Sequence, residues 1–163
     1  AEKFVAGFFA PEAKVKDIKI TDIESARRYK IVCHSDWIQD KITIDAMGLD
    51  CVQARDWKTM VQMLNKGRGD YMLAPFQSAP GGILEAYDVR FAPLPNIKVQ
   101  LNDDRVFLAS TQNPDSPAFQ EALNKGLGIL RANGSIDKAY TDSGFYNKAT
   151  EKWVLLNPST SPK

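Results

Sequence analysis

Residues 31–75 read IVCHSDWIQDKITIDAMGLDCVQARDWKTMVQMLNKGRGDYMLAP, and this stretch decides the fold. Three short apolar runs, in RRYKIVCHS (27–35), LDCVQA (49–54) and DYMLAPF (70–76), alternate with two stretches of helical periodicity. The order strand, helix, strand, helix, strand is typical of a parallel sheet with right-handed crossovers and helices on its faces. The sequence therefore predicts an α/β fold.

The first predicted helix follows Ser35. Asp36 and Gln39 have the spacing of a capping box, in which each side chain binds a backbone N–H of the first turn. Gly48 stands where this helix should end. The apolar side chains expected to face the core are Ile38, Ile42, Ala46 and Leu49.

The second predicted helix is capped by Asp56 and ends at Lys66-Gly67. Its apolar face comprises Trp57, Met60, Val61 and Leu64. The tripeptide Arg68-Gly69-Asp70, which a motif search would label a cell-adhesion signal, lies in the short connection to the third strand. We interpret it as a turn that feeds this strand.

The remaining chain carries weaker patterns. Residues 77–88 predict a helix broken by glycine, 89–100 an extended segment marked by Pro93 and Pro95, and 104–111 (DRVFLAST) another strand. Ser116 is expected to cap a helix with an apolar stripe, which Asn133-Gly134 ends, and Ser135 to cap a further short helix. The stripe comprises Phe119, Leu123, Gly126 or Leu127, and Leu130.

The composition is that of an ordinary soluble globular domain. Of 163 residues, 44% are hydrophobic, and 21 Lys and Arg are interspersed with 20 Asp and Glu. This balance disfavours binding to nucleic acid or to an anionic membrane surface. No apolar run reaches the roughly 20 residues of a membrane-spanning helix, so we expect no membrane insertion.

Two cysteines, Cys33 and Cys51, and the single histidine, His34, are too few for a four-ligand zinc site, and no cofactor is predicted. Cys33 lies late in one predicted strand and Cys51 early in the next, which implies a stagger of roughly three residues. We therefore expect free thiols. No catalytic Ser-His-Asp set, phosphate loop or carboxylate pair is present, so no enzyme is predicted.

The order of these parts resembles the bacterial family 3 extracellular solute-binding proteins, which have the type II periplasmic binding fold. The resemblance is carried by ITDIESARRYKIVCHSDWIQDKI (20–42), ARDWKTMVQMLNKGRGDYMLAPF (54–76) and SPAFQEALNKGLGILRANGSIDKAYTDSGF (116–145). It implies a periplasmic or extracytoplasmic binding protein of a transport system, with a membrane permease or a second copy of the chain as partner.

The resemblance also implies an organisation. Residues 1–25 would form a hinge-like strand and connector, 26–103 the α/β ligand-binding lobe, 104–157 a returning hinge strand with the closing helices, and 158–163 a flexible tail. Most of the family's first lobe has no counterpart, so the chain is expected to be either a fragment or a single-lobe protein.

In an open parallel sheet, ligands bind beyond the carboxyl ends of the strands. A small molecule is therefore expected to bind at three strand-end loops, with the contacts His34, Ser35, Asp36, Trp37, Arg55, Asp56, Trp57, Pro75, Phe76 and Gln77. The family's amino-acid anchors are altered, because Asp36 stands at the ligand-carboxylate position and Pro75 at that of the acid for the ligand ammonium. A standard amino acid is thus disfavoured. The alternative is a degenerate sensory or protein-interaction domain.

Overall fold

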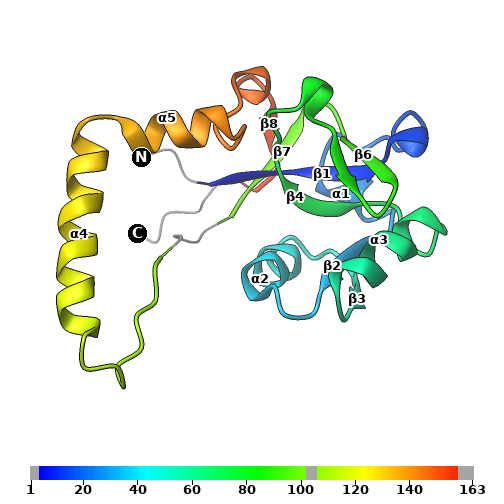
Figure 1. Cartoon of the computed structure of the whole chain (residues 1–163). Coiled ribbons are helices and arrows are strands. Elements are labelled where there is room, and N and C mark those ends of the chain that lie inside the picture. The colour runs from blue at the N-terminus through cyan, green and yellow to red at the C-terminus, as the bar shows by residue number, and fades with distance from the viewer. Residues whose placement is uncertain (1–3, 102–105, 158–163) are drawn as a thin grey trace.

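The computed structural model describes residues 4–101 and 106–157. The predicted alternation of strands and helices over 31–75 is confirmed (Figure 1). The elements are β1 (Val5–Pro11), α1 (Ile23–Ala26), β2 (Ile31–His34), α2 (Ile38–Ala46), β3 (Cys51–Ala54), α3 (Trp57–Asn65), β4 (Met72–Pro75), β5 (Leu84–Ala86), β6 (Val89–Pro93), β7 (Ile97–Gln100), α4 (Ser116–Ala132), α5 (Ser135–Asp142) and β8 (Val154–Leu155), with short 3₁₀ turns at Glu12–Lys14, Pro80–Gly82 and Lys148–Thr150.

Six of these strands share one direction. Strands β4, β6 and β7 all run antiparallel to β1, and β8 runs parallel to β7. Strand β3 runs parallel to β2, and a parallel bridge between Ile31 and Tyr71 joins β2 to the start of β4. Only β1 and the short β5 run the other way among the described strands. The expected sheet, mainly parallel with one antiparallel strand, is confirmed, and β5 is an addition to it.

Side-chain alternation divides the interior into two cores, because successive residues of a strand point to opposite faces. Phe8 and Ile31 lie in the core that α1 and α2 cover, whereas Phe9 and Val32 lie in the core that α3 covers. The prediction of helices on both faces is therefore confirmed.

The Arg68-Gly69-Asp70 segment is the predicted turn into β4. The Asp70 carboxylate accepts a hydrogen bond of 2.7 Å from the backbone N–H of Lys30, and the Asp70 N–H donates to the Lys30 carbonyl at 2.8 Å. A Cβ at Gly69 would lie 2.1 Å from Cγ2 of Val32. Both residues thus hold the start of β4 against β2, and only Arg68 of the three is exposed.

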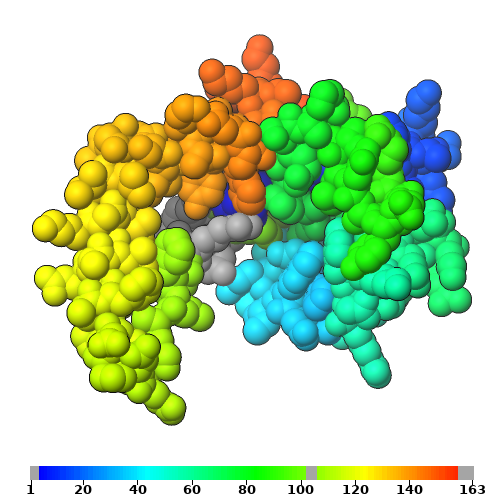
Figure 2. All heavy atoms as spheres, viewed as in Figure 1, coloured from blue at the N-terminus to red at the C-terminus, as the bar shows by residue number. Residues whose placement is uncertain are grey.

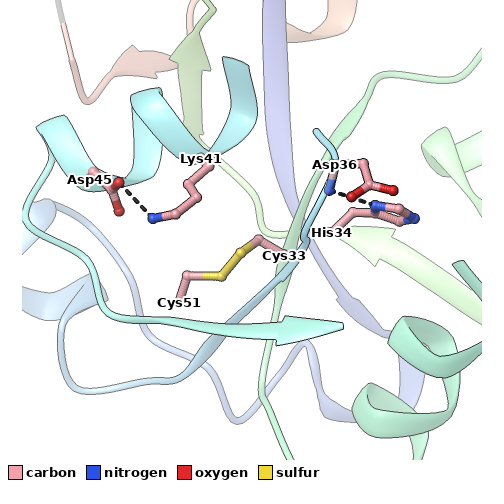
Figure 3. Close-up of a disulfide and its surroundings, with 6 residues drawn as sticks. All are labelled: Cys33, His34, Asp36, Lys41, Asp45 and Cys51. Atoms are coloured by element: carbon pink, nitrogen blue, oxygen red, sulfur yellow. Dashed lines mark hydrogen bonds and ion pairs between the residues drawn. A yellow bond between two sulfur atoms is a disulfide. The ribbon is translucent and has the colours of Figure 1, made fainter. Parts of the chain in front are cut away.

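The free-thiol prediction is wrong. Cys33 and Cys51 form a disulfide with a Cα–Cα distance of 6.0 Å (Figure 3). Cys33 pairs with Gln53 in the ladder, so the stagger between the cysteines is two residues and not three. Because an offset of two keeps both side chains on one face of the sheet, the sulfur atoms meet.

Helix α2 buries a different face from the predicted one. Thr43 and Ile44 are buried within it, whereas Ile38 and Ile42 face solvent. At 100° per residue, Ile38 and Ile44 lie about 120° apart on the helix, so the helix carries two apolar stripes and the sheet can cover one of them. Local periodicity could not decide between them.

Two further predictions are wrong. Residues 84–93 form a β-hairpin in place of the broken helix, because Tyr87 and Asp88 adopt positive φ angles of 48° and 61° and close a two-residue turn between β5 and β6. Residues 106–111 form no strand, and β1, the other predicted hinge strand, pairs instead with β4, β6 and β7.

Smaller differences concern the starts of two helices, and two predicted segments lie outside the described residues. Ser116 and Ser135 are the first helical residues of α4 and α5, so the caps are Asp115 and Gly134, one position before the predicted ones. The predicted strand start at 104–105 and the tail 158–163 lie outside the described residues.

Burial of Tyr71 predicts an alkaline loss of stability. Desolvation raises the pKa of its hydroxyl, which donates to the Ala26 carbonyl at 3.3 Å. The unfolded chain ionises this tyrosine near its ordinary pKa of about 10, while the folded chain keeps the proton, so stability present below pH 10 is lost as the pH rises. Relative to Tyr71→Phe, the wild type should lose about 1.4 kcal/mol of unfolding free energy per pH unit above pH 10.5. Urea unfolding at pH 8 to 11.5 measures this difference, and parallel curves for the two proteins would contradict it.

Candidate functional site

Strands β2 and β3 bring the first two predicted loops together. The strands are parallel with His34 opposite Ala54, so both end at the same edge of the sheet. The N–H of Ser35 donates to the Ala54 carbonyl at 2.9 Å and extends the pairing by one step. The segments 35–37 and 55–57 therefore leave the sheet side by side.

Three aromatic rings cluster at this edge. The rings of His34 and Trp37 are stacked with centroids 5.0 Å apart and an angle of 12° between their planes. Those of Trp37 and Trp57 lie 5.8 Å apart at 30°. Such offset ring pairs are each worth about 0.5–1.5 kcal/mol beyond area burial. Trp37 remains 38% exposed, so the cluster presents aromatic surface to solvent.

The polar groups around Trp37 differ from the predicted cap. The backbone N–H of Asp36 donates to Nδ1 of His34 at 3.1 Å (Figure 3). The Ser35 hydroxyl donates to the Asp36 carboxylate at 3.0 Å. Helix α2 has Trp37 at its N-cap, without a side-chain hydrogen bond. The predicted capping box is therefore wrong, because Asp36 binds Ser35 and not the first turn of the helix.

Asp56 supplies a second carboxylate beside the cluster, and its predicted role as N-cap of α3 is confirmed. It accepts from the backbone N–H and the hydroxyl of Thr59, both at 2.8 Å. These hydrogen bonds, with a smaller contribution from the charge of His34, hold the pKa of Asp56 below its usual value. Its neighbour Arg55 is exposed. The loop thus keeps a negative charge next to the aromatic rings.

The third loop contacts the C-terminal segment. Phe76 is buried against Phe9, and Trp153 meets its ring edge-on with centroids 5.5 Å apart. The Gln77 amide donates to the Pro75 carbonyl at 2.8 Å. The contacts of Phe76 and Gln77 therefore join this loop to the C-terminal segment, and Phe76 also belongs to the buried cluster against which Trp57 packs.

A cavity of about 510 Å³ lies between the third loop and the C-terminal segment. Gly144, at φ +84°, packs so closely that a Cβ would lie 2.3 Å from the backbone of Gln77. The Asn147 amide donates to the Gln77 carbonyl at 3.4 Å. The sequence did not predict that residues 141–153 line a cavity beside the third loop. The Ser143-Gly144 turn was the one local pattern that pointed to this packing.

Two structural features bear on the class of site. Within residues 4–101 and 106–157, no three His, Cys, Asp or Glu side chains are grouped so as to hold a metal ion. None of the described helices has the length and apolar character needed to cross a bilayer.

Comparison with known proteins places the fold. No family model matches the chain, and no curated protein matches it in sequence. An amino acid ABC transporter substrate-binding protein of Streptococcus pneumoniae, solved with L-arginine, superposes with a TM-score of 0.54 at 16% identity, over 93% of this chain and 60% of that protein. An ancestral arginine-binding protein bound to arginine superposes with a TM-score of 0.51 at 14% identity, over 87% and 61%.

The chain spans about three fifths of the length of these two binding proteins. At identities of 14–16% the likeness concerns the fold. The strand order, the two-sided helix cover and these superpositions agree. This chain has part of the α/β fold of ABC-transporter solute-binding proteins, which is called the type II periplasmic binding fold.

Proposed function

We propose that this chain is a solute-binding protein, or a domain of one, that works outside the cytoplasm with a membrane permease. The observation that carries the proposal is the aromatic cluster of His34, Trp37 and Trp57 at the carboxyl edge of parallel strands, where open α/β sheets bind ligands. The predicted hinge, lobe and closing-helix segments are part of this proposal. The proteins of similar fold named above are binding proteins and not enzymes.

The Cys33–Cys51 disulfide supports the location. Disulfides persist in oxidising compartments such as the periplasm and are rare in the reducing cytosol. This bridge closes the β2–α2–β3 unit that carries the aromatic cluster. A disulfide in that position fits a protein that meets its ligand outside the cytoplasm.

The charges around the cluster favour a cationic or uncharged ligand with an aromatic or apolar part, and not a standard amino acid. The carboxylates of Asp36 and Asp56 flank the rings and would repel a ligand carboxylate. Cations bind over tryptophan faces, which adds to the same preference. Pro75 provides no carboxylate for an α-ammonium group.

Ligand-induced stabilisation tests the proposal. Benzyltrimethylammonium, which combines a ring with a cation, should raise the melting temperature, and L-arginine and L-glutamine at the same concentration should not. Trp37→Ala should weaken binding of benzyltrimethylammonium at least about tenfold, because the middle ring of the cluster is removed.

The matched control is Trp153→Ala, since Trp153 lines the other cavity. If Trp153→Ala abolishes binding and Trp37→Ala leaves it intact, the ligand site is the cavity at the third loop. Stabilisation by L-arginine would overturn the exclusion of amino acids. If no probe binds, the solute-binding proposal fails for this part of the protein.

A second candidate is a domain that binds protein partners in place of a solute. The exposed apolar face of α4 favours it, because none of the residues of that helix is buried. A chain that binds none of the probes but forms a defined assembly would support this candidate.

A further inference from the structure

We propose that two copies of the chain pair by exchanging α4, so that α4 of each copy packs across α2 of the other. This inference is independent of any ligand. It follows from two exposed apolar surfaces of the same chain, one on α4 with its connector and one on α2, and Trp37 at the edge of the second also belongs to the proposed ligand site.

The first surface is α4 with its connector. Phe119 is 58% exposed, and Ile129 and Leu130 are also exposed on the same helix. In the connector, Val106, Phe107 and Leu108 face solvent as well, and Leu108 is 91% exposed. On a helical projection, Phe119, Leu123, Gly126 and Leu130 fall on one side, with Lys125 and Glu121 opposite. In the monomer, Phe119 and Leu130 of this face are exposed, and Leu123 and Gly126 are half-buried.

The glycines of α4 indicate that another surface packs closely against this helix. No atom lies within 4 Å of a Cβ built at Gly126 or Gly128. In a helix interior, each glycine costs about 1 kcal/mol relative to alanine. A helix of 17 residues carrying this cost and burying none of its side chains is not stable by itself in water. Close approach of a partner at Gly126 would offset the cost.

The second surface is the outer face of α2. Ile38 is 66% exposed and Ile42 53%, and Trp37 continues this apolar strip toward the aromatic cluster. The helical spacing of Ile38 and Ile42 predicts that they face a packing partner. In this chain, however, the core covers the other stripe of α2, which contains Thr43 and Ile44. The outer face of α2 is therefore ready for a partner helix.

The charges of the two helices are complementary. Within α2, Asp40 and Asp45 against Lys41 give a formal charge of −1. Along α4, Lys125 and Arg131 against Glu121 give +1. Opposite signs favour an α2–α4 contact over the pairing of α4 with a second α4.

The geometry favours exchange between copies. Figures 1 and 2 show α4 standing apart from the sheet and from α2, at the end of the extended connector. Its other end leads into α5, which is fixed through Tyr140 and Phe145 to Phe4 at the start of β1, with centroid distances of 5.8 and 5.1 Å. Anchored through α5, α4 is displayed to a second copy, and exchange of identical elements yields a closed twofold dimer.

Measurement of mass in solution tests the inference. Sedimentation equilibrium of the full chain should give twice the chain mass of 18.2 kDa at micromolar concentration. Leu130→Glu on α4 and Ile42→Glu on α2 should each raise the dimer dissociation constant at least about thirtyfold. Val154→Glu, at an exposed apolar position outside both surfaces, serves as the matched control and should not change it.

A mixing experiment distinguishes exchange from other dimers. The Leu130→Glu copy keeps an unchanged α2, and the Ile42→Glu copy keeps an unchanged α4. In a heterodimer of the two, one of the two α2–α4 contacts is therefore made by unchanged helices. The mixture should therefore dimerise more strongly than either variant alone. A monomeric wild type, or an Ile42→Glu variant that dimerises like wild type, would overturn the proposal.

Discussion

Phe8→Ala should lower the free energy of unfolding by about 3–5 kcal/mol, the range for deleting a buried aromatic ring. Phe8 is 1% exposed on the central strand β1, and its ring packs on Tyr71 with centroids 4.7 Å apart. Since β1 pairs with β4, β6 and β7, a cavity there loosens the sheet at its centre. Urea unfolding followed by circular dichroism measures the loss.

Phe119→Ala is the matched control for this prediction. It deletes the same side-chain atoms from an exposed position of α4. At concentrations low enough to keep the chain monomeric, its unfolding free energy should differ from wild type by no more than about 0.5 kcal/mol. Equal losses for the two variants would mean that Phe8 does not lie in the core described above.

Removal of the disulfide should cost about 3 kcal/mol. Cys33 and Cys51 are 18 residues apart, and a bridge of this span restricts the unfolded chain by roughly that amount in the chain-entropy model. The Cys33→Ala/Cys51→Ala double variant should therefore melt about 6–12 °C lower than the oxidised wild type, by scanning calorimetry.

Reduction of the wild type provides the control. Treatment with dithiothreitol should lower the melting temperature of the wild type toward that of the double variant and should leave the double variant unchanged. If the wild type and the double variant melt at the same temperature before reduction, the bridge does not form in solution.

The sequence by itself determined the β2–α2–β3–α3–β4 unit. Each of its signals is local: the Asp56 cap, the α3 face ending in Leu64, and the turn at Gly67 all depend on residues within a few positions of one another. The direction of the strands follows from the same local order, because a strand, helix and strand of this length connect in parallel. For the same reason the sequence predicted that His34 and Trp57 meet at one edge.

Only the tertiary structure decided the features that depend on register and on competition between surfaces. A stagger of two residues rather than three joins Cys33 to Cys51, and no local pattern distinguishes these offsets. The choice between the stripe of Ile38 and that of Ile44 depends on where β2 and β3 lie. The position of Gly144 against Gln77 brings together residues 67 positions apart, and it places the third loop beside a cavity that the C-terminal segment also lines. Short-range preferences fix the elements of this protein, whereas long-range packing fixes which of their surfaces are buried and which remain for a ligand or a second chain.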